Sequence, residues 1–229
     1  MLRTTPLVEG ETYHIYNRGA NKMDVFRSEY DSLRFLALLH LSNSSQSVRL
    51  EGYKTQGRSL RDVFEAAGPD KSLVDVSAYS LMPNHFHLVL KQKGDDGITR
   101  FMKKVCTAYS MYFNTKYERS GVLFQGRFRS SHVDSEPYFR WIFSYIHLNP
   151  VSLVEPAWKE NGIKETAKVR SFLRNYAYSS FFDYSVGKRP ERAILAYDDA
   201  PDFLTTQDDL EELLTGFERG RVLHDDLES

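Results

Sequence analysis

Two histidines in a strand-like segment are the first residues in this sequence that could do chemistry. His85 and His87 flank Phe86 in the run HFHLVLK. Successive side chains of a strand point to opposite faces, so both imidazoles would emerge on one face, about 7 Å apart. Such a pair can share one divalent metal ion. The H-x-H spacing also fits two ordinary surface or core histidines, so both interpretations stay open.

A tyrosine and an amide one helical turn apart form the second candidate, in the segment YIHLN. Tyr145 and Asn149 are four residues apart, so on a helix they would be neighbours beside its apolar core stripe. From there they could point over an open sheet face, toward the histidines. The alternative is a tyrosine at the edge of the core and an asparagine that ends the helix before Pro150.

The third candidate is a basic, aromatic stretch that runs from Arg100 to Arg140. It holds eight Lys or Arg residues against three acidic residues, a net charge of +5, with tyrosines and phenylalanines interleaved. Binding of single-stranded nucleic acid requires cations for the phosphates and flat rings for unpaired bases. A solvated helix face has the same composition, so the sequence allows both. The candidates for nucleic-acid contact in this stretch are Arg100, Lys103, Lys104, Arg127 and Arg129.

The charge is unevenly distributed, although the net charge of the 229 residues is only −1. Residues 198–229 carry eleven acidic and two basic side chains, a net charge of −9, and the rest of the chain carries +8. A basic, aromatic-rich body with an acidic tail favours a polyanionic partner. An ordinary enzyme with a solvated tail has the same charge pattern.

Several functional classes lack the residues that they need. Cys106 is the only cysteine, which excludes disulfide frameworks and cysteine-based zinc sites. The sequence has no Gly-rich phosphate loop followed by Lys, no G-x-G-x-x-G after a strand and no G-x-S-x-G elbow. Their absence removes nucleotide triphosphatases, dinucleotide oxidoreductases and α/β-hydrolases. No apolar run approaches the roughly 18 residues of a membrane span, and no signal peptide is evident, so we expect a cytoplasmic protein.

The elements that must position these residues follow an alternating order. Residue types and turn signals predict strands at 12–18, 74–82, 85–91 and 128–133, with a hairpin turn at Pro83-Asn84. Helical spacing predicts helices at 28–41, 97–117 and 135–149. This βαββαβ order with a following helix predicts a ferredoxin-like α+β fold. Such a fold is a two-layer sandwich in which one face of an antiparallel sheet stays open for a ligand or a further helix.

Two regions lie outside this pattern. Residues 42–73 are polar and contain several glycines, and we interpret them as an insertion with a short helix at 60–67. Beyond the last core helix, separate helical stretches are expected at 164–174 and 207–217. The predicted organisation is therefore a core over residues 1–157 and a helical C-terminal extension over residues 158–229 that ends in the acidic tail.

In combination, these motifs resemble those of the IS200-like single-tyrosine (Y1) transposases. Within that group the sequence is most similar to the REP-associated tyrosine transposases of bacterial chromosomes. The resemblance covers about residues 10–155 and is specific because several motifs occur in the same order. The segments that carry it are residues 13–19 (YHIYNRG), 81–89 (LMPNHFHLV), 126–128 (GRF) and 145–151 (YIHLNPV).

The resemblance implies an HUH nuclease, in which two histidines flanking a bulky apolar residue hold Mg²⁺ or Mn²⁺. Carried over to this sequence, His85 and His87 would be the metal ligands, with Phe86 between them. Tyr145 would be the nucleophile that becomes joined to DNA. Asn149 matches a position where related enzymes carry a Gln or Asn that completes the metal shell, although it would also end the helix.

The resemblance also implies the partner and the reaction. The partner would be single-stranded DNA near hairpin repeats, and Asn17, Arg18 and Arg127 lie in matched motifs that would contact it. Arg127 could equally be a structural ion-pair partner. Attack by the tyrosine would give a 5′-phosphotyrosine and a free 3′-hydroxyl, so strands could be rejoined without a nucleotide cofactor. The acidic tail could fold back on the basic groove and compete with DNA.

Two other functions compete with this interpretation. A domesticated protein could bind DNA hairpins without cutting them, although it would have no physical reason to keep both histidines and the tyrosine. A metal phosphodiesterase could use the histidines and an activated water, and would not need the tyrosine. The resemblance places the protein in the bacterial cytoplasm, associated with the nucleoid. It leaves open a monomer with its active site in cis or a homodimer that shares sites in trans.

Overall fold

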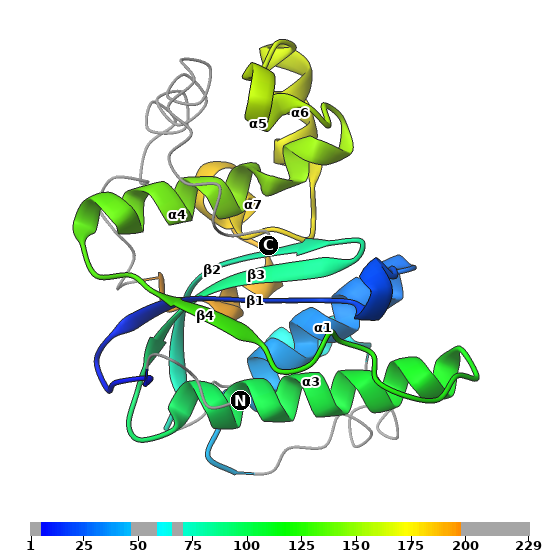
Figure 1. Cartoon of the computed structure of the whole chain (residues 1–229), viewed down its shortest axis with the longest axis vertical. Helices are drawn as coiled ribbons and strands as arrows, with labels where there is room; N and C mark the ends of the chain where they lie inside the picture. Colours follow the sequence, from blue (N-terminus) through cyan, green and yellow to red (C-terminus); the bar gives the residue numbers. More distant parts are fainter. Residues whose placement is uncertain (1–5, 47–58, 66–70, 198–229) are drawn as a thin grey trace.

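The computed structural model describes residues 6–46, 59–65 and 71–197 (Figure 1). Its core elements follow the predicted order and are β1 (Thr12–Arg18), α1 (Glu29–Ser42), β2 (Val74–Met82), β3 (His85–Gln92), α3 (Gly97–Lys116), β4 (Arg129–His132) and α4 (Glu136–Leu148). Three short helices follow, namely α5 (Trp158–Asn161), α6 (Thr166–Asn175) and α7 (Phe181–Ser185). The described residues also form the 3-10 helices η1 (Ala20–Lys22), η2 (Arg61–Glu65), η3 (Asn149–Leu153) and η4 (Pro190–Ile194).

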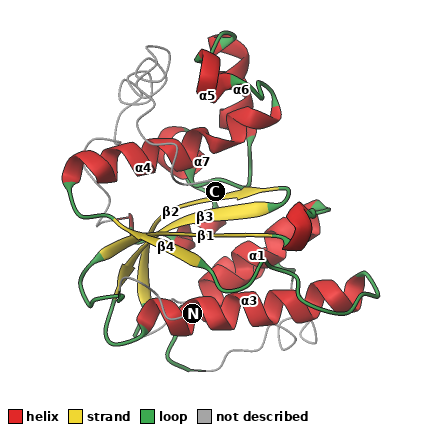
Figure 2. Ribbon diagram, viewed as in Figure 1, coloured by secondary structure: helices red, strands yellow, loops and turns green. Residues whose placement is uncertain are grey.

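The four strands form one antiparallel sheet in the order β2-β3-β1-β4. β1 therefore lies beside β3, with Tyr16 opposite His87 and Arg18 opposite His85. This arrangement of a βαββαβ chain is ferredoxin-like and confirms the predicted α+β class. Figure 2 shows the strands as one twisted layer with helices on both sides.

α1 and α3 cover one face of the sheet and enclose the main core. Ile15, Phe86 and Leu88 point to this face because they alternate with the polar residues of β1 and β3. α1 begins where the Ser28 hydroxyl accepts a hydrogen bond from the Asp31 backbone N–H at 3.3 Å, which is an N-cap. This layer therefore holds the main hydrophobic core of the protein.

α4 covers the other face of the sheet, which is the face of the histidines (Figure 1). Phe143 and Ile146 form a second core cluster with Ala78 of β2 and Val89 of β3. Pro137 lies in the first turn of α4, where its missing N–H costs no helical hydrogen bond. Sequence analysis left this face open for a ligand or a further helix, and the structure shows that a helix occupies part of it.

The C-terminal extension is attached to the outer edge of the sheet. The Leu81 backbone N–H donates to the Tyr178 carbonyl at 2.9 Å, and the Ser180 N–H donates to the Tyr79 carbonyl at 2.9 Å. These bonds satisfy backbone groups of β2 that an open edge strand would expose. The extension therefore closes one edge of the sheet as well as following the core in sequence.

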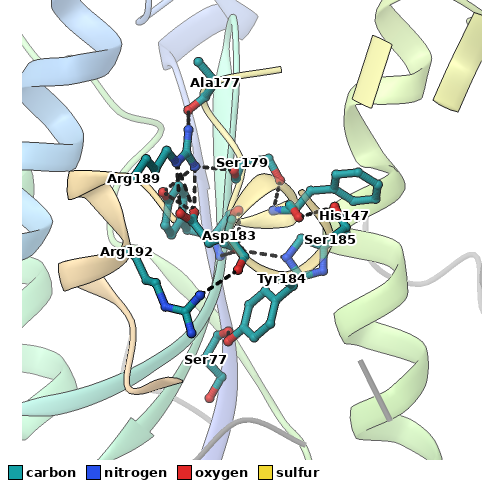
Figure 3. Close-up of polar contacts among 12 residues, drawn as sticks. Ser77, His147, Ala177, Ser179, Asp183, Tyr184, Ser185, Arg189 and Arg192 are labelled. Carbon is teal, nitrogen blue, oxygen red and sulfur yellow. Dashed lines mark hydrogen bonds and ion pairs between the residues drawn. The ribbon is translucent and has the colours of Figure 1, made fainter. Parts of the chain in front are cut away.

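A buried ion pair between Asp183 and Arg189 stabilises the C-terminal extension (Figure 3). Arg189 Nη2 lies 2.7 Å from Asp183 Oδ2, and the same guanidinium donates to the Ser179 carbonyl at 2.7 Å. Asp183 is buried. His147 of α4 lies 2.7 Å from the Ser180 hydroxyl, as measured from its Nε2. This contact links α4 to the segment and so fixes the helix that carries Tyr145.

The predicted insertion at 42–73 is described only in part. η2 stands where a short helix was expected at 60–67, and its Val63 and Phe64 are buried in the main core. The predicted helix at 164–174 is α6, shifted by one or two residues. The predicted helix at 207–217 and the acidic tail lie outside the described residues. No helix within the described ranges is long and apolar enough to cross a membrane.

Candidate active site

His85 and His87 project from β3 toward the layer of α4. Their ring centroids are 5.0 Å apart and their planes are perpendicular, at 90°. His87 is buried, and its Nε2 has no hydrogen-bond partner in the described structure. The neighbouring strand places Ser80 opposite His87, and the Ser80 hydroxyl is likewise buried without a partner there. Unsatisfied buried polar atoms on adjacent strands indicate a place for a ligand.

His14 of β1 contacts the other nitrogen of His87. The distance from His14 Nε2 to His87 Nδ1 is 2.8 Å, and the two rings are stacked with centroids 5.1 Å apart. Only one proton can lie between these nitrogens. If His87 Nδ1 carries it, the lone pair of His87 Nε2 is available as a metal ligand. The contact with His14 therefore bears directly on whether His87 can bind a metal ion.

Asn84 plays the corresponding part for His85. Asn84 Oδ1 lies 2.6 Å from His85 Nδ1, and Asn84 Nδ2 donates to the Lys22 carbonyl at 3.3 Å. Because the amide nitrogen is engaged by that carbonyl, the amide oxygen faces His85 and accepts its Nδ1–H. The hairpin turn thus holds His85 in the tautomer whose Nε2 can serve as a ligand.

α4 places Tyr145 against His87 within the same chain. The ring centroids are 5.7 Å apart and the planes are perpendicular, at 88°. Tyr145 is only 6% exposed, so a reacting group would meet it inside the site rather than in bulk solvent. Trp141, one turn earlier, stacks on the tyrosine ring at 5.4 Å and 16°. The tyrosine ring is therefore held between an indole and an imidazole.

A lysine of the C-terminal extension reaches the hydroxyl of the tyrosine. Lys159 Nζ of α5 donates to Tyr145 Oη at 3.0 Å and lies 4.9 Å from the ring centroid. Lys159 is half-buried, and the preceding Trp158 is buried. A positive charge thus lies beside the phenol oxygen.

Burial holds His14 and His87 in their neutral form. Burial lowers the pKa of His14 to about 3. Burial also lowers the pKa of His87 well below its usual value, and the charges of His85, His14, Lys159 and Arg18 lower it further. A neutral imidazole is the form that binds a metal ion. Lys159 and Arg18 give the site a positive potential, which favours an anionic group such as a phosphate.

Asn149 follows α4 directly, as the first residue of η3, and is buried. Its side-chain nitrogen has no hydrogen-bond partner in the described part of the chain, and η3 packs against β2. Amide oxygen and nitrogen exchange places when the side chain flips, so this atom can be a donor or an acceptor. Asn149 thus carries another unsatisfied polar atom of the site, on an element that adjoins β2.

These residues fit a divalent metal ion with an incomplete protein shell. The two hydrogen-bonded imidazoles each offer one nitrogen, and the buried Nε2 of His87 has no other partner in the described structure. Within residues 6–46, 59–65 and 71–197, no group of three or more His, Cys, Asp or Glu side chains could hold an ion. The remaining ligands would be amide, water or substrate oxygens, which is the usual arrangement for Mg²⁺ at phosphate-processing sites.

Arg18 and Arg129 are the predicted DNA-binding residues that share the face of the histidines. The strand register sets Arg18 opposite His85 and Arg129 opposite Tyr16. Arg129 is exposed, and Arg18 is near enough to His87 to lower its pKa. These two cations border the candidate site.

Asn17 lies on the opposite face of β1 and is buried. Its Nδ2 donates to the Gly126 carbonyl at 3.2 Å, and its Oδ1 accepts the Arg18 backbone N–H at 2.9 Å. The side chain therefore ties the loop before β4 to the sheet. Arg127 follows Gly126 in this loop and is exposed.

The predicted basic stretch does not form one surface with the histidines. Arg100, Lys103 and Lys104 lie on α3, in the layer on the other side of the sheet (Figure 1). Lys104 Nζ donates to the carbonyls of Ser44 and Gln46 at 2.5 and 2.6 Å, so it binds a neighbouring loop. Charge counted along the sequence cannot separate the two layers, because α3 covers one face of the sheet whereas Arg129 of β4 points to the opposite face.

Sequence analysis missed three residues of the site: His14, Asn84 and Lys159. His14 could have been found, because strand alternation puts it on the same face as Tyr16 and the ferredoxin-like order puts β1 beside β3. Asn84 was identified only as a turn residue. No pattern in the sequence marks Lys159, since its contact depends on how the extension folds back.

Comparison with known proteins identifies the family. The chain matches the family described as "Transposase IS200 like" over residues 8–149, and no curated protein is significantly similar to it. One similar solved structure is described as a REP-associated tyrosine transposase bound to a REP hairpin. It is 13% identical, with 80% of this chain and 84% of that chain covered and a TM-score of 0.49. Because the family match spans most of the chain, from β1 through the histidine pair to Tyr145 and Asn149, this protein belongs to the IS200-like transposase family.

Proposed function

We propose that this protein is a metal-dependent, single-strand DNA transesterase of the REP-associated type, with Tyr145 as its nucleophile. The observation that carries the proposal is the perpendicular contact of Tyr145 with His87 in one chain, with ring centroids 5.7 Å apart. A phenol beside a neutral imidazole and two cations has the components that attack on a phosphodiester requires.

In the proposed reaction, Tyr145 Oη attacks the phosphorus of a scissile phosphodiester. A Tyr–O–P bond forms and the bond from phosphorus to the 3′ oxygen breaks. The phenol gives its proton to water, and the leaving 3′ oxygen takes up a proton. The products are a 5′-phosphotyrosine and a free 3′-hydroxyl. Because the energy of the phosphodiester is kept in the new ester, a 3′-hydroxyl can reverse the step and rejoin a strand without a nucleotide cofactor.

His85, His87 and Asn149 are the proposed protein ligands of Mg²⁺ or Mn²⁺. When bound, such an ion supplies positive charge that polarises the scissile phosphate. Side chains of the protein perform the other functions of the site. His14 and Asn84 orient the imidazoles, and Trp141 excludes water from one face of the tyrosine.

The proposed partner is single-stranded DNA that carries hairpin repeats, as expected for an enzyme that needs unpaired bases. Arg18 and Arg129 are the proposed contacts beside the scissile phosphate, and Arg127 is the proposed contact from the exposed loop. Asn17 would act through the loop that it holds. The cations of α3, which are Arg100, Lys103 and Lys104, could contact only DNA that passes around the sheet.

We further propose that residues 1–157 are the transposase core, with the insertion at 42–73, and that residues 158–229 are an extension. The cytoplasmic, nucleoid-associated location expected from sequence belongs to this proposal. Since Tyr145 and His87 meet within one chain, a monomer with its active site in cis is the proposed functional unit.

The test is covalent capture of DNA. The protein is incubated with single-stranded hairpin oligonucleotides from the repeats that flank its gene, with Mg²⁺ or Mn²⁺, and an SDS-resistant adduct is sought. We expect an adduct with the wild type and none with Tyr145→Phe, which keeps the ring contacts and lacks the nucleophile. Cleavage that survives Tyr145→Phe would indicate a hydrolytic phosphodiesterase instead. Binding with neither cleavage nor adduct would indicate a domesticated hairpin-binding protein.

A further inference from the structure

We propose that Lys159 is a catalytic residue that stabilises the negative charge on Tyr145 Oη in both cutting and rejoining. This inference rests on the proposed function, because it concerns the same attacking oxygen. Its starting point is the 3.0 Å contact between Lys159 Nζ and Tyr145 Oη. An ammonium group has only donors, so the phenol oxygen must accept this bond. The charge therefore acts on the atom that attacks phosphorus.

The position of Lys159 is fixed by packing and does not depend on a free surface side chain. Its neighbour Trp158 is 1% exposed and lies in a small core cluster with Leu148 and Val151. Leu148 is the last residue of α4, three residues after Tyr145. α4 carries the nucleophile and α5 carries the lysine, and the two helices share one core. This shared core holds the two side chains beside each other.

The surroundings make this charge effective. Tyr145 is 6% exposed and Lys159 is half-buried, so less water screens the interaction than at an open surface. The ring of Tyr145 in turn contacts His87, with ring centroids 5.7 Å apart. The ammonium therefore lies next to both the nucleophile and the proposed phosphate site.

The lysine has a part in each direction of the reaction. A free phenol has a pKa of about 10 and is a weak nucleophile at neutral pH. As the phenol loses its proton and attacks, the ammonium stabilises the oxygen that becomes the phosphotyrosine ester. In the reverse step a 3′-hydroxyl attacks phosphorus, the Tyr–O–P bond breaks, and the same ammonium stabilises the departing phenolate. In each direction the attacking hydroxyl gives its proton to water and the departing oxygen takes one up, so Lys159 itself stays protonated throughout.

The test compares Lys159→Met, Lys159→Arg and the matched control Lys168→Met. Lys168 is an exposed lysine of α6 in the same extension, so its loss removes equal charge without touching the site. We measure the single-turnover rate of adduct formation with the hairpin oligonucleotides, together with DNA affinity and Mn²⁺ affinity. Lys159→Met is expected to slow adduct formation about 100-fold, the effect of removing one donor from a reacting oxygen. Lys168→Met should match the wild type, and Lys159→Arg should retain much of the rate.

A second measurement separates catalysis from structure. Replacing Tyr145 by 3,5-difluorotyrosine stabilises the phenolate without a cation, because the fluorines withdraw electron density and lower the pKa of the phenol, so it should restore most of the rate lost in Lys159→Met. The DNA affinity and the Mn²⁺ affinity of Lys159→Met should stay within about twofold of the wild type. A Lys159→Met rate equal to that of Lys168→Met would overturn the assignment. So would a loss that difluorotyrosine does not rescue, or one that merely parallels weaker DNA binding. If the wild type forms no adduct, the proposed function fails and the role of Lys159 fails with it; if only Lys159 is dispensable, the function stands.

Discussion

Replacing His14 with phenylalanine tests whether the hydrogen bond between His14 and His87 determines which nitrogen of His87 can bind a metal ion. His14 is fully buried, and its Nε2 lies 2.8 Å from His87 Nδ1. Phenylalanine keeps a flat ring against both Tyr16 and His87 but has no acceptor. The Nδ1–H of His87 would then lose its partner, or the proton would move to Nε2 and block the ligand atom.

Each of these outcomes has a calculable cost. A buried donor left without a partner lowers the free energy of unfolding by about 1–3 kcal/mol. Loss of a hydrogen-bond partner behind a metal-binding histidine lowers metal affinity about 10- to 100-fold, which is about 1.4–2.7 kcal/mol. His14 is the partner of His87 Nδ1, so we expect Mn²⁺ affinity to fall at least about tenfold in His14→Phe.

The assay is calorimetric titration with Mn²⁺, combined with denaturant unfolding of the same samples. His14→Gln is the conservative variant, because its carbonyl can accept the His87 proton and should preserve part of the affinity. His40→Phe is the matched control. His40 of α1 is 6% exposed, and its Nδ1 lies 3.2 Å from the Ala193 carbonyl oxygen, in the layer on the other side of the sheet, so its loss should cost stability and leave Mn²⁺ affinity intact. Unchanged Mn²⁺ affinity in His14→Phe would refute the reasoning, as would an equal loss of affinity in His40→Phe.

Two further predictions concern stability. Asp183→Asn breaks the buried pair with Arg189 and should lower the free energy of unfolding by about 3 kcal/mol, whereas Glu136→Gln, in an exposed pair, should cost under about 1 kcal/mol in the same denaturant titration. Burial alone would raise the pKa of Asp31, but hydrogen bonds from Lys116 and two tyrosines outweigh it and lower that pKa. Its stabilisation is therefore present above the unfolded pKa of about 3.9 and is lost as pH falls through the folded pKa. Asp31→Asn should be less stable than the wild type at pH 7 and should approach it in acid; a gap that persists below pH 2 would contradict this.

The faces of the strands could be predicted from the sequence because they depend on local geometry alone. Alternation with a period of two residues puts His85 and His87 on one side and Phe86 on the other, and the structure has this arrangement. The order of strands and helices followed in the same way from turn residues and apolar spacing, and it specified the ferredoxin-like class. The motif around Tyr145 was recognisable because its residues are contiguous.

The docking of α4 could not be predicted, because an apolar stripe shows that a helix is packed but not what it packs against. The sequence allowed Tyr145 to be a residue at the edge of the core, and only the contacts of Phe143 and Ile146 with the sheet bring it to His87. The same limit applies to the basic stretch. Arg100 and Arg129 are counted together along the chain, yet the sheet separates their layers.

By itself, the sequence determined the residues that can react, the face on which the histidines lie and the family to which the chain belongs. Tertiary structure alone decided the partners of those residues: His14 behind His87, and Lys159 beside Tyr145. The first pair joins positions 73 residues apart, and the second joins α4 and α5, which have η3 between them in the chain. Such contacts depend on how elements pack around a shared core. Local sequence patterns do not reveal that packing, because it results from the burial of apolar surface over the whole domain.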